Sequence, residues 1–250
     1  MPPEAPLVWT QPFTVRAYEV GPGDVASPLA VIDYLQEAAG EHARALGVEH
    51  FDIGDEGAAW VLSRLAMEIE RLPSWREAVT IETWPSGRDG LRATRDLVLR
   101  DASGGVIVRA RTVWYVFDLA RRRPTRLPPA VMAIDPPDRP ASLDLPDAPT
   151  PPEAAGAMRS FDVRRSDLDR NGHANNARFA EWALEAADRP LATLRALDLA
   201  FKGEALVGDT IESTAAPEAG DGASGGDALA HAILRASDRR LLATARTLWT

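Results

Sequence analysis

Apolar residues in the first part of the chain recur with a helical period. Between Leu29 and Leu46 they return every three or four residues, which is typical of a helix with one buried face. Ser27 is a favourable N-cap, Pro28 suits the first helical position, and Gly47 ends the pattern. The pattern therefore predicts one long helix close to the N-terminus.

A second helix is predicted at ARFAEWALEAADR, beginning after Asn175 or Asn176 and ending before Pro190. After each helix, apolar and polar positions alternate, as expected for strands with one buried face. These strand-like stretches are Leu65–Ile69, Val79–Ile81 and the segment ending at Trp114, then Leu197–Phe201, Thr210–Ile211 and the segment ending at Trp249. One helix followed by an antiparallel sheet, twice over, predicts an α+β fold.

The two halves also resemble each other in sequence. VLRDASGGVIVRARTVW (98–114) aligns without gaps on ILRASDRRLLATARTLW (233–249), and both read as a strand, a polar turn and a strand. A shorter similarity joins TIE at 80–82 to TIE at 210–212. We infer that the chain arose by duplication.

Proline separates the halves. Ten of the 20 prolines fall between Leu119 and Met158. Because proline fixes φ and lacks a backbone donor, this stretch suits an extended linker. We therefore predict an N-terminal domain at 1–132, a linker at 133–158 and a C-terminal domain at 159–250.

Composition and charge exclude several classes of function. The chain has no cysteine, which rules out disulfides, thiolate metal sites and a cysteine nucleophile. A net charge of −9 argues against broad binding to nucleic acid or to an anionic membrane. No signal-peptide pattern opens the chain and no apolar run approaches a membrane span, so we expect a cytoplasmic protein without membrane insertion.

The densest polar cluster, RRSDLDRNGHANN at 164–176, lies just before the second helix. Asp169, Asn171 and His173 occupy alternate positions, which would project together from an extended segment, and the helix start that follows favours an anion. Ordinary turn and capping residues are an alternative interpretation, and a metal site at Asp169 and His173 would lack an evident third ligand. The corresponding stretch of the first half, RAYEVGPGDVASP, has neither Asn nor His, which favours a site in the second half only.

The segment DLDRNGHANNARFAEWALEA resembles the D-x-N-x-H-x-N-N motif of the acyl-acyl carrier protein (acyl-ACP) thioesterases, best known from plant plastids. VRAYEVGPGDVASPLAVIDYLQEAAGEHARALG and WVLSRLAMEIERLPSWREAVTIETWPSG resemble the same family, and the resemblance covers roughly 13–132 and 160–249. It implies a tandem double-hotdog fold, with each half a long helix wrapped by an antiparallel sheet. It also implies four catalytic residues, Asp169, Asn171, His173 and Glu204. Many plant members have a cysteine after this glutamate, where the present chain has Ala205.

The resemblance implies hydrolysis of a fatty acyl thioester carried by ACP, with no cofactor and no metal. Asp169 and Glu204 would supply the base, and either a carboxylate activates water or one of them attacks first. The acyl chain would occupy a tunnel in the N-terminal domain, lined by its helix and by the strand at 60–72. A hotdog acyl-CoA thioesterase and a noncatalytic acyl-binding protein are the alternatives. The sequence does not indicate which acyl chain length is preferred, and a homodimer is possible.

An acidic carrier requires a local basic surface on this acidic chain. The first candidate is Arg121, Arg122, Arg123 and Arg126, and Arg164 with Arg165 is the second. The alternative is that these arginines are solvated or pair with nearby aspartates. We interpret His42, His50 and His231 as structural, and AGDGASGGD at 219–227 as a hairpin loop without a phosphate-binding motif.

Overall fold

The computed structural model describes residues 5–49, 57–154, 156–218 and 227–250. The chain forms two compact units, unit 1 at Met1–Asp144 and unit 2 at Leu145–Thr250, and each is described by itself. His50 and all but the last residue of the 219–227 loop lie outside the described residues.

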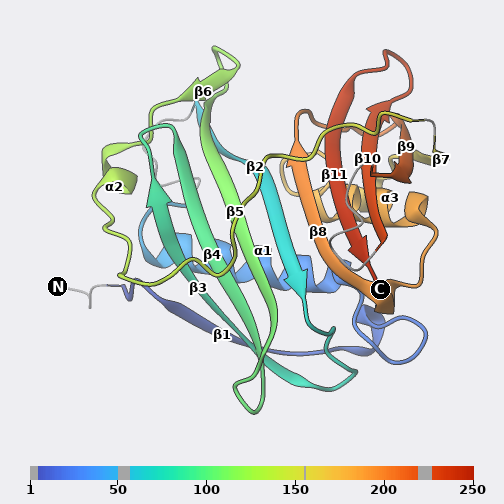
Figure 1. Cartoon of the computed structure of the whole chain (residues 1–250). Coiled ribbons are helices and arrows are strands. Elements are labelled where there is room, and N and C mark those ends of the chain that lie inside the picture. Colours follow the sequence, from blue (N-terminus) through green and yellow to red (C-terminus); the bar gives the residue numbers. More distant parts are fainter. Residues whose placement is uncertain (1–4, 50–56, 155, 219–226) are drawn as a thin grey trace. The chain divides into compact units, whose positions relative to one another are not determined.

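Unit 1 is an antiparallel sheet that curves around one long helix, α1 (Pro28–Ala45), drawn in blue in Figure 1. The strand order is β1-β3-β4-β5-β2, with the short β6 paired to β5. The bounds are β1 Trp9–Thr14, η1 Ala17–Glu19, β2 Ala58–Ile69, β3 Ala78–Arg88, β4 Arg92–Asp101, β5 Val106–Asp118, β6 Arg123–Thr125 and α2 Pro129–Met132. As predicted, Ser27 caps α1: its Oγ accepts a hydrogen bond from the Ala30 amide at 3.1 Å.

Unit 2 repeats this plan around a shorter helix, α3 (Asn176–Ala187). Its strand order is β8-β11-β10-β9-β7. The bounds are β7 Ala157–Asp162, η2 Arg165–Asp167, η3 Leu191–Thr193, β8 Leu194–Phe201, β9 Thr210–Pro217, β10 Asp227–Arg235 and β11 Leu241–Trp249. Asn175 is the N-cap of α3, and its side chain accepts from the Ala177 amide at 2.9 Å. The predicted α+β fold, a helix wrapped by an antiparallel sheet in each half, is confirmed.

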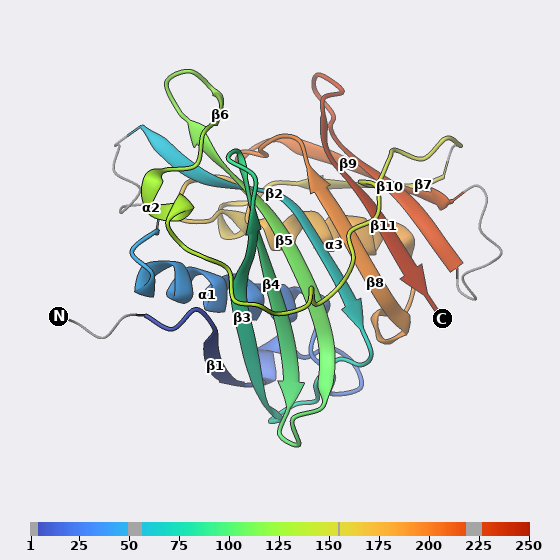
Figure 2. The same cartoon turned by 60° about the vertical axis from the view of Figure 1, so that its left-hand side comes forward.

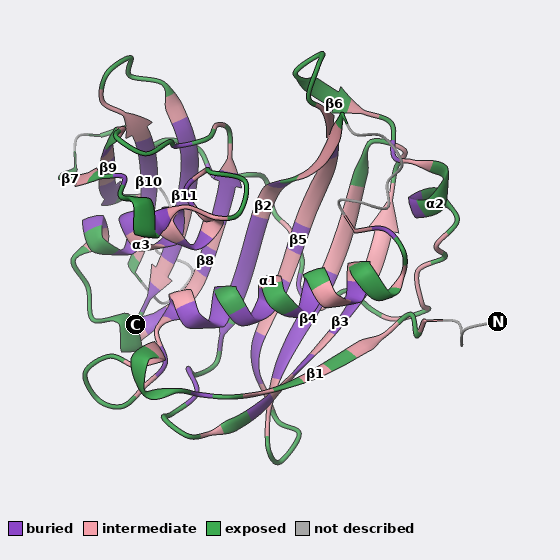
Figure 3. Cartoon of the chain, turned by 180° about the vertical axis from the view of Figure 1, so that it is seen from behind, coloured by how far each residue is buried: buried purple, intermediate pink, exposed green. Residues whose placement is uncertain are grey.

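The core of unit 1 lies between α1 and the concave face of its sheet. Figure 3 shows buried residues along the side of α1 that faces the strands and exposed residues on the other side. Ile32 and Leu35 of α1 are about 1% exposed, and Ile81, Leu97 and Leu99 of the sheet are fully buried. The helical and alternating patterns of the sequence thus converge on one apolar layer.

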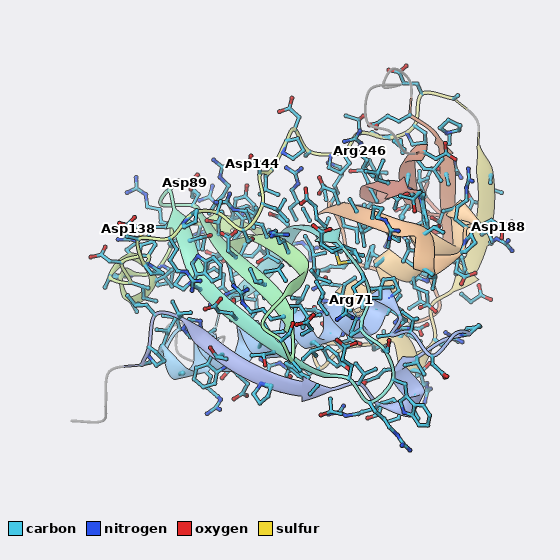
Figure 4. The ribbon with its side chains drawn as sticks, turned by 60° about the horizontal axis from the view of Figure 1, so that its bottom comes forward. Arg71, Asp89, Asp138, Asp144, Asp188 and Arg246 are labelled. Atoms are coloured by element: carbon cyan, nitrogen blue, oxygen red, sulfur yellow. The ribbon has the colours of Figure 1, made fainter. Side chains whose placement is uncertain are left out.

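The convex face of the unit 1 sheet carries the proline-rich segment at 133–144, as Figure 2 shows. Ser142 anchors it, because the fully buried carboxylate of Asp96 accepts from the Ser142 amide at 2.6 Å. Arg139 forms two hydrogen bonds to Glu82, at 3.0 and 3.2 Å. Asp138 and Asp144 are exposed and point away from the sheet (Figure 4). This part of the predicted linker therefore packs on unit 1, while the predicted boundaries at 132 and 159 stay a prediction.

The registers of the two sheets support the inferred duplication. Both units have a β-bulge at the same place, where Ser63 and Arg195 are skipped in the pairing. Trp114 and Trp249 each donate from Nε1 to the threonine two residues earlier, at 2.9 and 2.7 Å. Identical local geometry at matching positions is typical of duplicated halves.

The sequence alignment of the halves nevertheless needs correction. In the first turn Asp101 N donates to Gly105 O, and in the second Arg235 N donates to Arg240 O, both at 2.9 Å. The two turns therefore differ by one residue, so the gapless match is correct for β5 and β11 but one residue out for β4 and β10. The TIE similarity is also not a structural match, because Thr210 takes the place of Ala78 at the start of its strand.

Candidate active site

The polar cluster of unit 2 forms a tight loop between η2 and α3. Asp169 N donates to His173 O at 2.7 Å and closes the loop. The Asp169 carboxylate accepts from the amides of Asn171 and His173 at 2.8 and 3.2 Å, and from the Asn171 side chain at 3.4 Å. Gly172 has φ 81°, a conformation that glycine adopts at little cost. The Asp169 side chain therefore fixes the positions of Asn171 and His173.

Glu204 reaches the same site from the segment after β8. Its Oε2 lies 3.6 Å from His173 Nε2, and the side chains are 59% and 37% exposed. Ala174 N donates to Ala205 O at 2.9 Å and ties the Glu204 segment to the loop. The structure thus brings together all four residues that the sequence singled out. Asn171 is exposed, so both its amide and the His173–Glu204 pair are open to an incoming molecule.

Beneath the loop, Asp167 forms a support that sequence analysis missed. It is 4% exposed, and it accepts from the backbone amide of Arg164 at 2.8 Å and from its guanidinium at 3.1 Å. Burial alone would raise the pKa of Asp167, but the hydrogen bonds from Arg164 outweigh it and the pKa lies below its ordinary value. The Asp167 carbonyl accepts from Asn175 N at 2.8 Å, which links this pair to the helix cap. In the sequence, only the three-residue spacing of Arg164 and Asp167 indicated that the two side chains could pair.

Unit 1 builds the same frame without the polar groups. Its loop is closed by Gly21 N donating to Val25 O at 3.0 Å, and Ser27 N donates to Glu19 O at 2.9 Å. Ala26 N donates to Pro73 O at 2.8 Å, as Ala174 N does to Ala205 O. By these matching bonds, Asp169, Asn171, His173 and Glu204 have as their counterparts Gly21, Gly23, Val25 and Leu72. The frame therefore does not require a carboxylate, an amide or an imidazole, and the capping interpretation does not account for all four.

The described residues contain no group of three or more His, Cys, Asp or Glu side chains that could hold a metal ion. They also include no helix with the length and apolar character needed to cross a membrane. The loop and the segment after β8 present two carboxylates, an imidazole and a carboxamide next to the start of α3.

Both halves of the sequence match the models of one known protein family. Residues 6–134 match the family model of the acyl-ACP thioesterase N-terminal domain, and residues 151–250 match that of the C-terminal domain. The chain belongs to the acyl-ACP thioesterase family. A chloroplastic palmitoyl-acyl carrier protein thioesterase of Gossypium hirsutum is 32% identical over 221 residues, which cover 79% of this chain and 52% of that protein. A chloroplastic protein of the same name from Arabidopsis thaliana is 29% identical, over 98% of this chain and 64% of its own length.

The fold is also that of solved acyl-ACP thioesterases. The acyl-ACP thioesterase from Bacteroides thetaiotaomicron superposes with a TM-score of 0.84 at 22% identity, covering 97% of this chain and 98% of the other. The 12:0-ACP thioesterase from Umbellularia californica gives 0.83 at 23% identity, covering 98% of both chains. The two units are therefore a tandem pair of hotdog folds. The chain spans about half to two thirds of the length of the curated plant relatives that it matches.

In this acyl-ACP thioesterase family member, the arginines proposed for carrier docking lie on the β5–β6 hairpin of unit 1. Arg121, Arg122, Arg123 and Arg126 are all exposed. Arg121 pairs with Asp118 at 3.1 Å, and no acidic partner lies within ion-pair distance of the other three among the described residues. Of the second candidate pair, Arg164 is engaged by Asp167 and Arg165 is exposed.

Proposed function

We propose that the protein hydrolyses fatty acyl thioesters carried by acyl carrier protein, releasing a free fatty acid and the carrier thiol. One observation carries this proposal: unit 2 adds two carboxylates, an amide and an imidazole to a frame that unit 1 builds without them. Family membership supports it, and relatives named as palmitoyl-acyl carrier protein thioesterases suggest the substrate class.

In the proposed reaction, Glu204 acts as the base and His173, 3.6 Å away, orients it and the attacking water. The water oxygen attacks the thioester carbonyl and its proton passes to the carboxylate. The C–S bond then breaks, and the leaving thiolate takes the proton. Asn171 and the start of α3 would stabilise the oxyanion.

Asp169 has a different role in this proposal. Its carboxylate is occupied by the amides of Asn171 and His173, so it positions both side chains. Direct attack by a carboxylate on the thioester is the second route, and it would form a mixed anhydride. Turnover in H₂¹⁸O followed by mass spectrometry tests this second route. Label in the peptide that contains Glu204 or Asp169 supports attack by that residue, because it arises only when water opens the anhydride at the enzyme-side carbonyl. Label in the fatty acid alone is expected both for the water route and for an anhydride that water opens at the acyl-side carbonyl.

The main test is substitution within the site. Glu204→Gln, Asp169→Asn and His173→Ala should each lower kcat by about 10²–10⁴ without unfolding the protein, because each removes a positioned acid–base group or its support. Glu185→Gln, which changes an exposed carboxylate on α3, is the matched control. Circular dichroism reports the fold. Near-normal turnover in the Glu204 and Asp169 variants would remove the carboxylate mechanism.

Two competing functions are distinguished by the carrier and by turnover. The same acyl chain presented on ACP and on coenzyme A should give a higher kcat/KM on ACP, and the reverse would favour an acyl-CoA thioesterase. Tight acyl binding without turnover would favour a noncatalytic protein. The fatty acids released during expression, measured by mass spectrometry, would give the chain length.

A cytoplasmic location, a homodimer and a carrier surface at the β5–β6 hairpin belong to the same proposal. Cell fractionation tests the location, and sedimentation tests the homodimer.

A further inference from the structure

Unit 1 holds a polar cluster between α1 and the concave face of its sheet. Arg95 of β4 places Nη1 2.9 Å from Nδ1 of His42 on α1 and 3.2 Å from Oγ1 of Thr83 on β3. His42 and Thr83 are fully buried. Trp9 of β1 stacks on His42 with ring centroids 5.9 Å apart. The cluster therefore lies inside the unit, among residues that would otherwise form an apolar core.

The hydrogen bonds define the charge of this cluster. His42 Nε2 lies 2.9 Å from the Pro6 carbonyl oxygen, which only accepts, so Nε2 carries the proton and Nδ1 accepts from Arg95. Burial, and then the Arg95 charge, lower the pKa of His42 to about 4, so the imidazole is neutral at pH 7. Burial lowers the pKa of Arg95 to about 10, so its guanidinium remains charged. Within the described part of the chain, no carboxylate lies within ion-pair distance of Arg95.

The other unit shows that the fold does not need this charge. Arg95 is paired with Pro85 on one side and Thr112 on the other. The corresponding residue in unit 2, between Pro217 and Thr247, is Leu229. Thr83 likewise corresponds to Ala215, since each stands opposite the first residue of its edge strand. The hotdog fold therefore forms in unit 2 with a leucine and an alanine at the positions where unit 1 has a cation and a hydroxyl.

One edge of the Arg95 guanidinium has no partner. Nη1 makes both hydrogen bonds of the cluster, and Nε and Nη2 make none to any residue that the structure describes. The Nε and Nη2 donors are parallel and match the two oxygens of a carboxylate. Arg95 is half-buried, and neither Nε nor Nη2 is among the fully buried side-chain atoms without a partner in the described structure, so this edge is not fully closed off.

Apolar side chains lie close to Arg95 along β4. Ala93 lies two residues before Arg95 on the same face of β4, and it packs against a buried cluster of Val48, Val116, Leu127 and Val131. Ala43, Leu46, Ala58, Trp60 and Ile134 pack against the same cluster and are only partly buried. An uncompensated cation beside partly exposed apolar side chains matches an amphiphile with an anionic head and an aliphatic tail.

We propose that Arg95 forms, with this apolar surface, a binding site inside unit 1 for an aliphatic carboxylate. The guanidinium binds the carboxylate through Nε and Nη2, and the partly buried apolar side chains contact the chain. Two sources share this chemistry: a free fatty acid, and an acyl chain that carries a carboxylate at its far end. Binding does not depend on the hydrolytic activity proposed above, so the two proposals can fail separately.

The test is calorimetric titration of delipidated protein at pH 7.5 with dodecanoate and with 1-dodecanol, and intrinsic tryptophan fluorescence, to which Trp9 contributes, serves as a second readout. Dodecanoate should bind about tenfold or more tightly than the alcohol, because only the carboxylate pairs with both donors. Arg95→Met should abolish this preference without weakening alcohol binding, and Arg95→Lys, which keeps the charge but loses the fork, should retain part of it. Arg92→Met, on the same strand but exposed and paired with Asp89, is the matched control and should behave as wild type.

Monomethyl dodecanedioate, an ester with a far carboxylate, distinguishes the sources. If it binds more tightly than dodecanoate in an Arg95-dependent way, the site takes acyl chains with a far carboxylate. If dodecanoate binds more tightly, it takes free fatty acids. Equal binding of dodecanoate and 1-dodecanol by the wild-type protein, or a preference that survives in Arg95→Met, would overturn the proposal; the first comparison needs no variant.

Discussion

His231 and Leu97 occupy the same position in the two sheets, each opposite an alanine of the neighbouring strand. His231 is fully buried, its Nε2 lies 2.8 Å from Thr247 Oγ1, and its Nδ1 has no hydrogen-bond partner in the described structure. Burial lowers the pKa of this imidazole to about 4. The residue is therefore expected to make stability depend on pH, which Leu97 does not.

The direction of this pH dependence follows from proton uptake by the unfolded chain. Below pH 6.5 the unfolded chain protonates this histidine while the folded protein does not, so the stability present above pH 6.5 is lost as the pH falls toward 4. Each pH unit in that window changes the free energy of unfolding by about 1.4 kcal/mol. His231→Leu should therefore reduce the loss of stability between pH 7.5 and pH 5 by about 2 kcal/mol, measured by urea unfolding. An unchanged pH dependence would show that folding does not lower the pKa of His231.

The residues of the candidate site were predictable because their chemistry is visible in sequence. Asp169, Asn171 and His173 stand within five positions, and the first half lacks them. Glu204 came only from the family resemblance, since nothing in its local sequence points to the loop. Asp167 and Arg95 were missed because their importance lies in burial, and burial of a charged residue has no local signature.

At the scale of elements, the two helix caps allow a matched comparison. Ser27 and Asn175 each accept a hydrogen bond from the first turn of their helix. Replacing either by alanine should cost about 1 kcal/mol of stability. Only Asn175→Ala should also lower kcat, by about tenfold or more, because α3 begins at the proposed site and a displaced helix start misplaces the reacting groups. Urea unfolding and steady-state kinetics test this, and an equal kinetic effect of Ser27→Ala would contradict it.

Ser142 anchors the proline-rich segment to the sheet of unit 1. Ser142 Oγ lies 2.5 Å from the buried Asp96 carboxylate and 2.8 Å from the Ala110 carbonyl oxygen. Ser142→Ala leaves these acceptors less satisfied and should cost about 1–3 kcal/mol, with faster proteolysis within 133–144. Ser103→Ala, which removes an exposed Ser–Asp hydrogen bond in the β4–β5 turn, should have little effect on unfolding. Equal losses of stability in both variants would show that burial of Asp96 does not increase the contribution of its hydrogen bonds to stability.

Helices and central strands followed from periodicity, whereas the edge strands did not. β1 contains Pro12, and a proline in a strand argues against a central position. It is tolerated because β1 pairs only with β3 and forms an edge of its sheet. The one-residue difference in length between the two hairpin turns could not be predicted from the sequence either, because turns of different length can have similar sequences. Turn geometry, not composition, sets the register there.

At the scale of the whole molecule, duplication gave two units with the same frame, and the units carry polar side chains at different positions. Unit 2 has polar groups on the loop before its helix and Leu229 in its sheet. Unit 1 has glycine and valine on the equivalent loop and Arg95 in the sheet. The halves have thus specialised by side chain while keeping the backbone, which is why a repeat can be recognised in sequence while the roles of its halves must be argued separately.

The chain carries a net charge of −9, so an acidic carrier protein is repelled on average and must be steered by a local basic surface. On the β5–β6 hairpin, Arg122, Arg123 and Arg126 have no acidic partner within ion-pair distance in the described structure, whereas Arg121 pairs with Asp118. Reversing the three unpaired arginines to glutamate should raise KM for acyl-ACP by about tenfold at low ionic strength with little change in kcat, because rim charges act mostly on association. The effect should shrink in 0.5 M salt, and Arg121→Glu alone should do less than Arg123→Glu. Unchanged kinetics of the triple variant at low salt would exclude this hairpin from carrier docking and leave the site on unit 2 unaffected.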